Sequence, residues 1–339
     1  MIFYKTIIQG RLSFNNEKSF GKVHKMFEYR TETYYKNDVL VDQEEIFNDE
    51  ALTLSIPRFV GNATDKSFRN TVSLLEYCSQ FAVSGEINAW MINEGKVINQ
   101  KNIQPDSDKA IVMQFRKADE YFRLGHDGEA LEALNRTLEK YDAHAQAYER
   151  RGWVNMRLKN YSDALYDFNK AIKIDDSIAF AYHGKAIIAR NEDNLEEAIK
   201  NFELTLKKSV ALESLYWKAR VKKAECHINR GEWDKAEFDL RFFTKRKFKE
   251  GDKNLRKKAY GHMMYSYVLL QKEMTAEALE QIDLAFENYV EDSKGFTPAK
   301  GHYYRGLIKQ ALGKKDFKDE LKKAQELGSK KAEELLAQV

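Results

Sequence analysis

The chain has 339 residues, of which 43% are hydrophobic and 32% are charged. Its 56 Lys and Arg residues nearly balance its 53 Asp and Glu residues, so a net charge of +3 gives no general affinity for nucleic acid. No stretch approaches the roughly 18 consecutive apolar residues that a membrane-spanning helix needs. The composition therefore predicts a soluble, cytoplasmic protein without a membrane span and with a highly charged surface.

Residues 1–105 are predicted to form a small α+β domain. Short runs rich in β-branched and aromatic residues predict strands at Ile2–Phe14 and Leu52–Pro57, and a third strand fits Asp38–Asp42. The first of these runs has neither the basic leader nor the cleavage site of a signal peptide. Apolar residues recur at helical spacing in Lys18–Tyr29 and Ser67–Ala82.

The same domain is predicted to end in a hairpin. Gly85–Ile92 and Val97–Ile98 are its strands, and Asn93-Glu94-Gly95 forms the turn. The resulting order of strand, helix, strand, strand, helix, strand resembles the split βαβ sandwich of ferredoxin-like domains. Pro105-Asp106-Ser107-Asp108 marks the domain boundary, with Ser107 or Asp108 expected to cap the next helix.

Beyond residue 110 the sequence repeats with a period of 34 residues. Four columns of similar residues stay in phase over three copies, which chance rarely produces. These columns are Ala130, Ala164 and Ala198; Leu134, Phe168 and Phe202; Ala118, Gly152 and Ala186; and Gln114, Tyr148 and Tyr182.

These columns resemble the tetratricopeptide repeat, a helix–turn–helix unit of 34 residues. The resemblance implies that the small residues let paired helices approach, while the large apolar residue fills the space beside them. The repeats are expected near residues 111–144, 145–178, 179–212, 217–250, 259–292 and 298–328, with an unusually long joint between the fourth and fifth. We therefore predict a mainly α protein, in which a helical solenoid of five to six repeats spans 106–328, ahead of a capping helix at 329–339.

The resemblance also implies a concave groove, lined by the first helix of each repeat, that binds a polypeptide. Arginines beside aromatic side chains suit an acidic peptide with apolar anchors, although some of these aromatics are equally suited to packing between repeats. The lysine–asparagine pattern of chaperone-binding members is absent. The predicted groove residues are Phe115, Arg116, Phe122, Arg150, Trp153, Arg157, Phe180, His183, Arg190, Lys218, Lys222, Tyr260 and Tyr267.

A basic segment at residues 241–258 suggests a second kind of partner. Phe242, Phe243 and Phe248 lie between its cations and are suited to stacking on bases, as in a nucleic-acid-binding protein. The alternative is a solvated helix end and loop, where cations are favoured. The cations of this basic patch are Lys245, Arg246, Lys247, Lys249, Arg256, Lys257 and Lys258.

No recognisable catalytic motif or metal-ligand spacing occurs among the seven histidines and two cysteines. Cys78 and Cys226 are predicted to be buried thiols of a reducing compartment. The leading interpretation is therefore a non-enzymatic scaffold or adaptor that needs no cofactor, binds a protein and is able to self-associate. Nucleic-acid binding through residues 241–258 is the main alternative, and an active site within residues 1–105 is a third.

Overall fold

The computed structural model describes residues 2–107 and 109–338, so Asp108, one of the two predicted capping residues, and Val339, the end of the predicted capping helix, lie outside the described residues. The chain divides into two compact units, Met1–Gly184 and Lys185–Val339, and each is described by itself. Among the described residues no helix is long and apolar enough to cross a bilayer.

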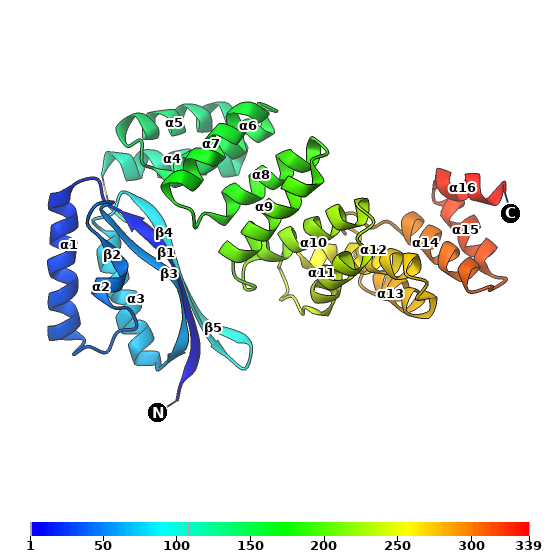
Figure 1. Ribbon diagram of the computed structural model, residues 1–339, viewed down its shortest axis with the longest axis horizontal. Helices are drawn as coiled ribbons and strands as arrows, with labels where there is room; N and C mark the ends of the chain where they lie inside the picture. Colours follow the sequence, from blue (N-terminus) through cyan, green and yellow to red (C-terminus); the bar gives the residue numbers. More distant parts are fainter. Residues whose placement is uncertain (1, 108, 339) are drawn as a thin grey trace. The chain divides into compact units, whose positions relative to one another are not determined.

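The first unit begins with a five-stranded antiparallel sheet in the order β2-β3-β1-β4-β5. Helices α1, α2 and α3 pack on one face of this sheet (Figure 1) and enclose the core of the domain. The order β2-β3-β1-β4, with one helix after β1 and another after β3, is that of the predicted split βαβ domain, and β5 adds a strand at the edge. The elements are β1 Tyr4–Ser13, α1 Glu17–Tyr29, a π-helical turn at Arg30–Tyr34, α2 Gln43–Ile46, β2 Phe47–Asn48, β3 Thr53–Ala63, α3 Asp65–Ser79, β4 Ser84–Asn93 and β5 Lys96–Ile103.

The strand predicted at Asp38–Asp42 is wrong, because the polar side chains at both of its ends bond to helices instead. Asp38 accepts hydrogen bonds from Ser67 and Asn70 of α3. Asp42 caps α2 by accepting a hydrogen bond from the backbone N–H of Glu44 at 2.9 Å. The second strand in chain order is instead the short β2.

Strand β3 continues beyond the predicted end at Pro57. The register between β1 and β3 shifts between Ile8 and Gly10, and this bulge accommodates the proline, which cannot donate to the sheet. The hairpin turn is as predicted: Glu94 and Gly95 both have positive φ angles, 47° and 76°, as a tight two-residue turn requires. Ser107 does not cap the next helix, which begins at Ala110 behind Lys109 without a side-chain cap.

Paired helices follow the sheet domain, as the tetratricopeptide resemblance predicts. The first unit contains α4 Ala110–Leu124, α5 Asp127–Lys140, α6 Ala145–Arg157 and α7 Tyr161–Ile174, and α8 Ala179–Asn191 crosses into the second. The second unit continues with α9 Leu195–Lys208, α10 Ser214–Asn229, α11 Trp233–Lys245, a short 3₁₀ turn at Leu255–Lys257, α12 Lys258–Gln271, α13 Thr275–Glu287, α14 Pro298–Ala311, α15 Phe317–Glu326 and α16 Lys330–Leu336.

Phe168 shows why the repeat columns carry small residues. Its ring is fully buried in the first unit. A Cβ atom added to Gly152 of α6 would lie 2.7 Å from Cε1 of this ring, and one added to Gly184 of α8 would lie 2.3 Å from Cζ. Glycine at these two positions therefore lets the neighbouring helices close around the phenylalanine ring.

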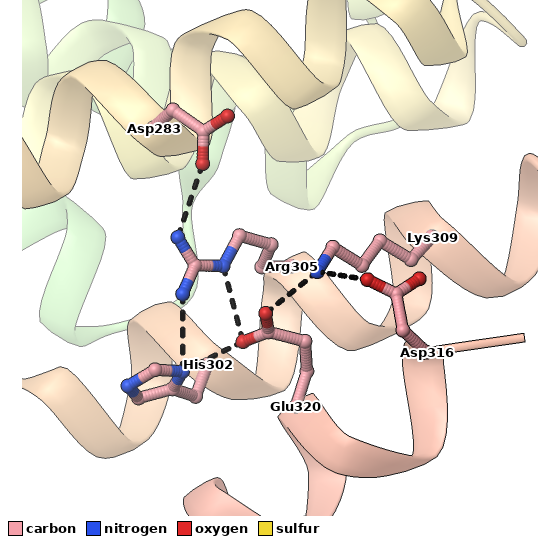
Figure 2. A network of polar contacts seen from close by, with 6 residues as sticks. All are labelled: Asp283, His302, Arg305, Lys309, Asp316 and Glu320. Atoms are coloured by element: carbon pink, nitrogen blue, oxygen red, sulfur yellow. Dashed lines mark hydrogen bonds and ion pairs between the residues drawn. The ribbon is translucent and has the colours of Figure 1, made fainter. Parts of the chain in front are cut away.

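The last helix pairs of the second unit are joined by a polar network around Glu320 (Figure 2). Its carboxylate accepts hydrogen bonds from His302 and Lys309 of α14, each at 2.7 Å, and pairs with Arg305 Nε at 3.1 Å. Burial alone would raise the pKa of Glu320, but these three partners outweigh it and lower the pKa to about 2. The network therefore holds Glu320 ionised between α14 and α15.

Candidate functional site

A cleft of about 830 Å³ lies in the first unit between the sheet domain and the first two helix pairs. One wall comes from residues 83–86 and 104–105, and the other from α4 and α6. The lining residues are Val83, Ser84, Gly85, Glu86, Gln104, Pro105, Val112, Met113, Phe115, Arg116, Lys117, Asp119, Glu120, Arg123, Leu124, His144, Gln146 and Arg150.

The two walls are fixed to each other by hydrogen bonds. The Gly85 backbone N–H donates to the Gln146 side chain at 3.1 Å, and Arg116 donates to the Pro105 carbonyl at 2.7 Å. Elsewhere in the unit, Arg11 of β1 donates to the Ile174 carbonyl at the end of α7, at 2.9 Å. The cleft is therefore held open by contacts that do not need a ligand.

Large apolar side chains are exposed on the helical wall. Met113 is 55% exposed and Leu124 is 62% exposed, at opposite ends of α4. Phe115, which is half-buried, packs against the His144 ring with 4.4 Å between ring centroids. Exposed apolar side chains gathered in a concave surface are typical of a site that buries the anchors of a partner.

The charges that line the cleft are largely paired with one another. Arg150 lies 2.7 Å from Asp119 and 2.7 Å from the buried Glu149, while Arg123 lies 3.1 Å from Asp119. Arg116 pairs with Asp106 at 2.8 Å. The lining contains the cations Arg116, Lys117, Arg123 and Arg150 and the anions Glu86, Asp119 and Glu120. The cleft is therefore close to neutral, and its arginines already have carboxylate partners.

His144 supplies a buried polar group at the floor of the cleft. Its Nδ1 accepts a hydrogen bond from the Ala147 backbone N–H at 3.2 Å, which serves as the cap of α6. Burial lowers the pKa of His144 to about 3, so its ring is neutral near pH 7. Nε2 has no hydrogen-bond partner among the described residues and is the ring nitrogen that remains for a ligand.

Three of the predicted groove residues, Phe115, Arg116 and Arg150, line this cleft, whereas five others of the first unit do not. Trp153 packs against Phe168 and the buried His183, with ring centroids 5.5 and 6.1 Å away, as expected for packing between repeats. Phe180 is 48% exposed. Arg157 pairs with Asp127, and its guanidinium lies 4.2 Å from the centroid of the Phe122 ring.

The predicted groove residues of the second unit gather mainly around Glu225 of α10. Its carboxylate binds Lys222 at 2.8 Å, Arg190 at 3.1 Å and the Tyr260 hydroxyl at 3.1 Å. Tyr267 instead packs against Trp233 and Tyr304. A pocket of about 260 Å³ lies beside Glu225 and is lined by Val221, Lys222, Glu225, Lys257, Tyr260, Lys294, Gly295 and Lys300.

The basic segment does not form a single surface. Phe243 is buried and Phe248 packs against Trp217 and Phe243, so that of the three phenylalanines only Phe242 is largely exposed. The cations also separate: Lys258 is buried and donates to the Thr244 carbonyl, Arg256 pairs with Asp292, Lys257 lines the pocket beside Glu225, and Arg246 lies over the Trp217 ring. Lys245, Lys247 and Lys249 are exposed.

Sequence reasoning missed the sheet-domain wall of the cleft, as well as Met113 and Leu124. The wall residues 83–86 carry no chemical motif, and the repeat columns place only helix residues. The exposed apolar residues at both ends of α4 did offer a signal, because Met113 and Leu124 are 11 residues apart and fall on one face of a helix. Lys294 and Lys300 were missed because the joints between repeats follow no periodic pattern.

Both cysteines are buried, as predicted, and neither is in a disulfide. Burial raises the pKa of Cys226 to about 11, which keeps it as an unreactive thiol. Among residues 2–107 and 109–338, no three His, Cys, Asp or Glu side chains are grouped so that they could hold a metal ion.

Comparison with known proteins agrees with the helical architecture. Residues 115–177 match the family model described as tetratricopeptide repeat. Among solved structures, YrrB, described as a TPR protein with an unusual peptide-binding site, is 17% identical with a TM-score of 0.52, over 62% of this chain and all of its own. PilF of Pseudomonas aeruginosa is 14% identical with a TM-score of 0.54, over 68% of this chain and 99% of its own. No curated protein sequence matches the chain.

The helix pairs, their small-residue columns and these likenesses define a helical-repeat protein. More specifically, the chain is a tetratricopeptide-repeat protein with an antiparallel sheet domain at its N-terminal end, which confirms the resemblance seen in the sequence. The structural likenesses, at these low identities, extend to the fold alone.

Proposed function

We propose that the chain is a non-enzymatic, cytoplasmic interaction scaffold that binds an extended polypeptide in the cleft between the sheet domain and helices α4 and α6. The observation that carries this proposal is the exposure of Met113 and Leu124 in a concave surface whose charged residues are already paired. A scaffold of this kind acts through shape, since repeat proteins present rigid concave surfaces.

The size and chemistry of the cleft suit a peptide. A volume of about 830 Å³ lies within the roughly 300–1,000 Å³ of typical ligand sites and accommodates several side chains of an extended segment. Met113 and Leu124 offer apolar contacts, and methionine adapts to partners of varied shape. The Nε2 atom of His144 adds a polar contact at the floor. YrrB, which shares the fold, is described as having a peptide-binding site, and this likeness supports the proposal.

The paired charges refine the expected partner. Because the lining cations and anions nearly cancel, an acidic partner gains little from this cleft, and its apolar anchors supply most of the binding free energy. We therefore propose a largely uncharged peptide with apolar side chains as the occupant. A nucleic-acid function is not proposed, because two of the three phenylalanines of segment 241–258 are packed within the fold.

The proposal is tested by selecting peptides from a random library against the full chain and measuring their affinity by isothermal titration calorimetry. Changing Met113 and Leu124 together to serine removes two exposed anchors, and we expect the affinity of selected peptides to fall roughly 30-fold or more. Tyr166→Ser is the matched control, because Tyr166 is also 55% exposed but lies on α7 outside the cleft. Equal affinities of the Met113/Leu124 variant and the parent chain would rule out this cleft.

Salt provides an independent prediction for the same peptides. Apolar anchors and internally paired charges should make the affinity change by less than about threefold between 50 and 500 mM NaCl, because screening acts on exposed unpaired charges. Binding governed by phosphate or strongly acidic ligands would instead weaken by orders of magnitude over this range. A steep fall for the selected peptides would contradict the apolar-anchor account.

A further inference from the structure

The pocket of about 260 Å³ in the second unit collects lysines from several separate elements. Lys222 comes from α10, Lys257 from the 3₁₀ turn before α12, Lys294 from the joint before α14 and Lys300 from α14. Lys218 lies one helical turn before Lys222. The pocket therefore lies where the two long joints of this unit meet the first helices of consecutive repeats.

The positive charge of this pocket is not neutralised by the protein. Glu225 is the one carboxylate among the lining residues, and it is already bound to Lys222, Arg190 and Tyr260. The ammonium groups of Lys218, Lys257 and Lys294 form no hydrogen bond or ion pair with any of the described residues. Three unpaired cations thus lie around a single occupied carboxylate.

The lysines also act on one another. Burial, with the charges of Lys218 and Lys222, lowers the pKa of Lys257 to about 8. Burial and the ammonium groups of Lys222, Lys253 and Lys294 lower the pKa of Lys218 in the same way. Mutual repulsion of this kind is relieved when an anion binds among the cations.

The joints that carry these lysines are fixed in place. The Lys294 backbone N–H donates to the Arg256 carbonyl at 2.9 Å, and the Arg256 side chain pairs with Asp292 at 2.9 Å. Gly295 has a φ of +88°, and a Cβ atom there would lie 2.7 Å from the Tyr260 ring. The two joints are therefore tied together against Tyr260, which holds Lys257 and Lys294 on one side of the pocket.

We propose that this pocket binds a phosphoryl dianion, carried either by a free phosphorylated small molecule or by a phosphorylated side chain. A phosphoryl group carries close to two negative charges and three acceptor oxygens, which matches several ammonium donors that approach from different elements. The volume lies below the roughly 300 Å³ of ordinary small-molecule sites, which suits one headgroup. This site goes beyond the polypeptide cleft and lies in the other unit.

Calorimetric titration of the full chain with three probes tests the proposal. The probes are inorganic phosphate, a short glycine–serine peptide with one phosphoserine, and the same peptide with glutamate in place of phosphoserine. Saturable binding of inorganic phosphate would support a site that needs only the phosphoryl group, and binding of the phosphopeptide alone would support a phosphorylated side chain. Binding of neither, or equal binding of the glutamate peptide, would overturn the proposal.

A pair of matched variants separates a built site from general positive charge. Lys257→Gln with Lys294→Gln should weaken phosphate or phosphopeptide binding roughly 30-fold or more, because each lost charged hydrogen bond costs about tenfold. Lys247→Gln with Lys249→Gln removes the same charge from exposed positions outside the pocket, and should change affinity less than about twofold.

Equal weakening by both pairs would overturn the specific site. Because the pocket lysines repel one another, their replacement should leave the melting temperature unchanged or raised, so a loss of binding is separable from a loss of folding. Peptides selected for the first cleft should bind the Lys257/Lys294 variant with unchanged affinity, which distinguishes failure of this inference from failure of the polypeptide site.

Discussion

Phe168→Ala is expected to lower the free energy of unfolding of the first unit by about 3–5 kcal/mol, the usual cost of removing a buried phenylalanine ring. The ring is fully buried, and the glycines at 152 and 184 allow α6 and α8 to close around it, so these helices have little freedom to fill the cavity. Urea unfolding followed by tryptophan fluorescence measures the effect, since Trp153 lies 5.5 Å from this ring.

Phe180→Ala is the matched control for this prediction. Phe180 is 48% exposed in α8, so its removal should cost less than about 1 kcal/mol. A similar cost for both variants would contradict the assignment of Phe168 as the residue that fills the space between helix pairs.

Glu320→Gln is expected to destabilise the end of the second unit by about 3 kcal/mol. The change leaves His302, Arg305 and Lys309 around a neutral amide, and breaking a buried ion pair by removing one partner typically costs about 3–5 kcal/mol. Amide hydrogen exchange should show the loss as faster exchange in α14, α15 and α16. Glu326→Gln on the exposed side of α15 is the control, and equal effects of both changes would contradict the network's role.

The same network predicts how stability depends on pH. The pKa of Glu320 in the folded chain, about 2, is lower than its ordinary value of 4.5, so the ionised form stabilises the fold. This contribution is fully present above pH 4.5 and is lost as the pH falls from 4.5 through 2. Parent chain and Glu320→Gln should therefore converge in the stability of α14–α16 as the pH falls through this window, as measured by hydrogen exchange.

The repeat architecture was predictable because its determinants are local and periodic. Ala130, Ala164 and Phe168 recur at fixed spacing, and the structure buries all three. The strand order of the sheet domain followed from the alternation of strand-like and helical segments. The strand at Asp38–Asp42 was wrong because side-chain hydrogen bonds to α2 and α3, which the local pattern does not reveal, replaced a backbone ladder.

The two candidate sites were predictable only in part. The family resemblance named Phe115, Arg116 and Arg150, since these belong to a first helix of a repeat. It could not name the opposite wall, which depends on a contact between Gly85 and Gln146, 61 residues apart in the sequence. The lysine pocket likewise depends on Lys294 and Lys300, whose positions are set by the hydrogen bonds and packing of the joints.

The central claim, that a polypeptide binds between the sheet domain and α4, is tested most directly by methyl nuclear magnetic resonance. The chain has eight methionines, among them Met113 in the cleft and Met91 in the core of the sheet domain. Titrating a selected peptide into the full chain, labelled with ¹³C at the methionine methyl groups, should shift the Met113 signal in proportion to occupancy and leave Met91 unchanged. Saturable peptide binding with no change at Met113 would contradict the account.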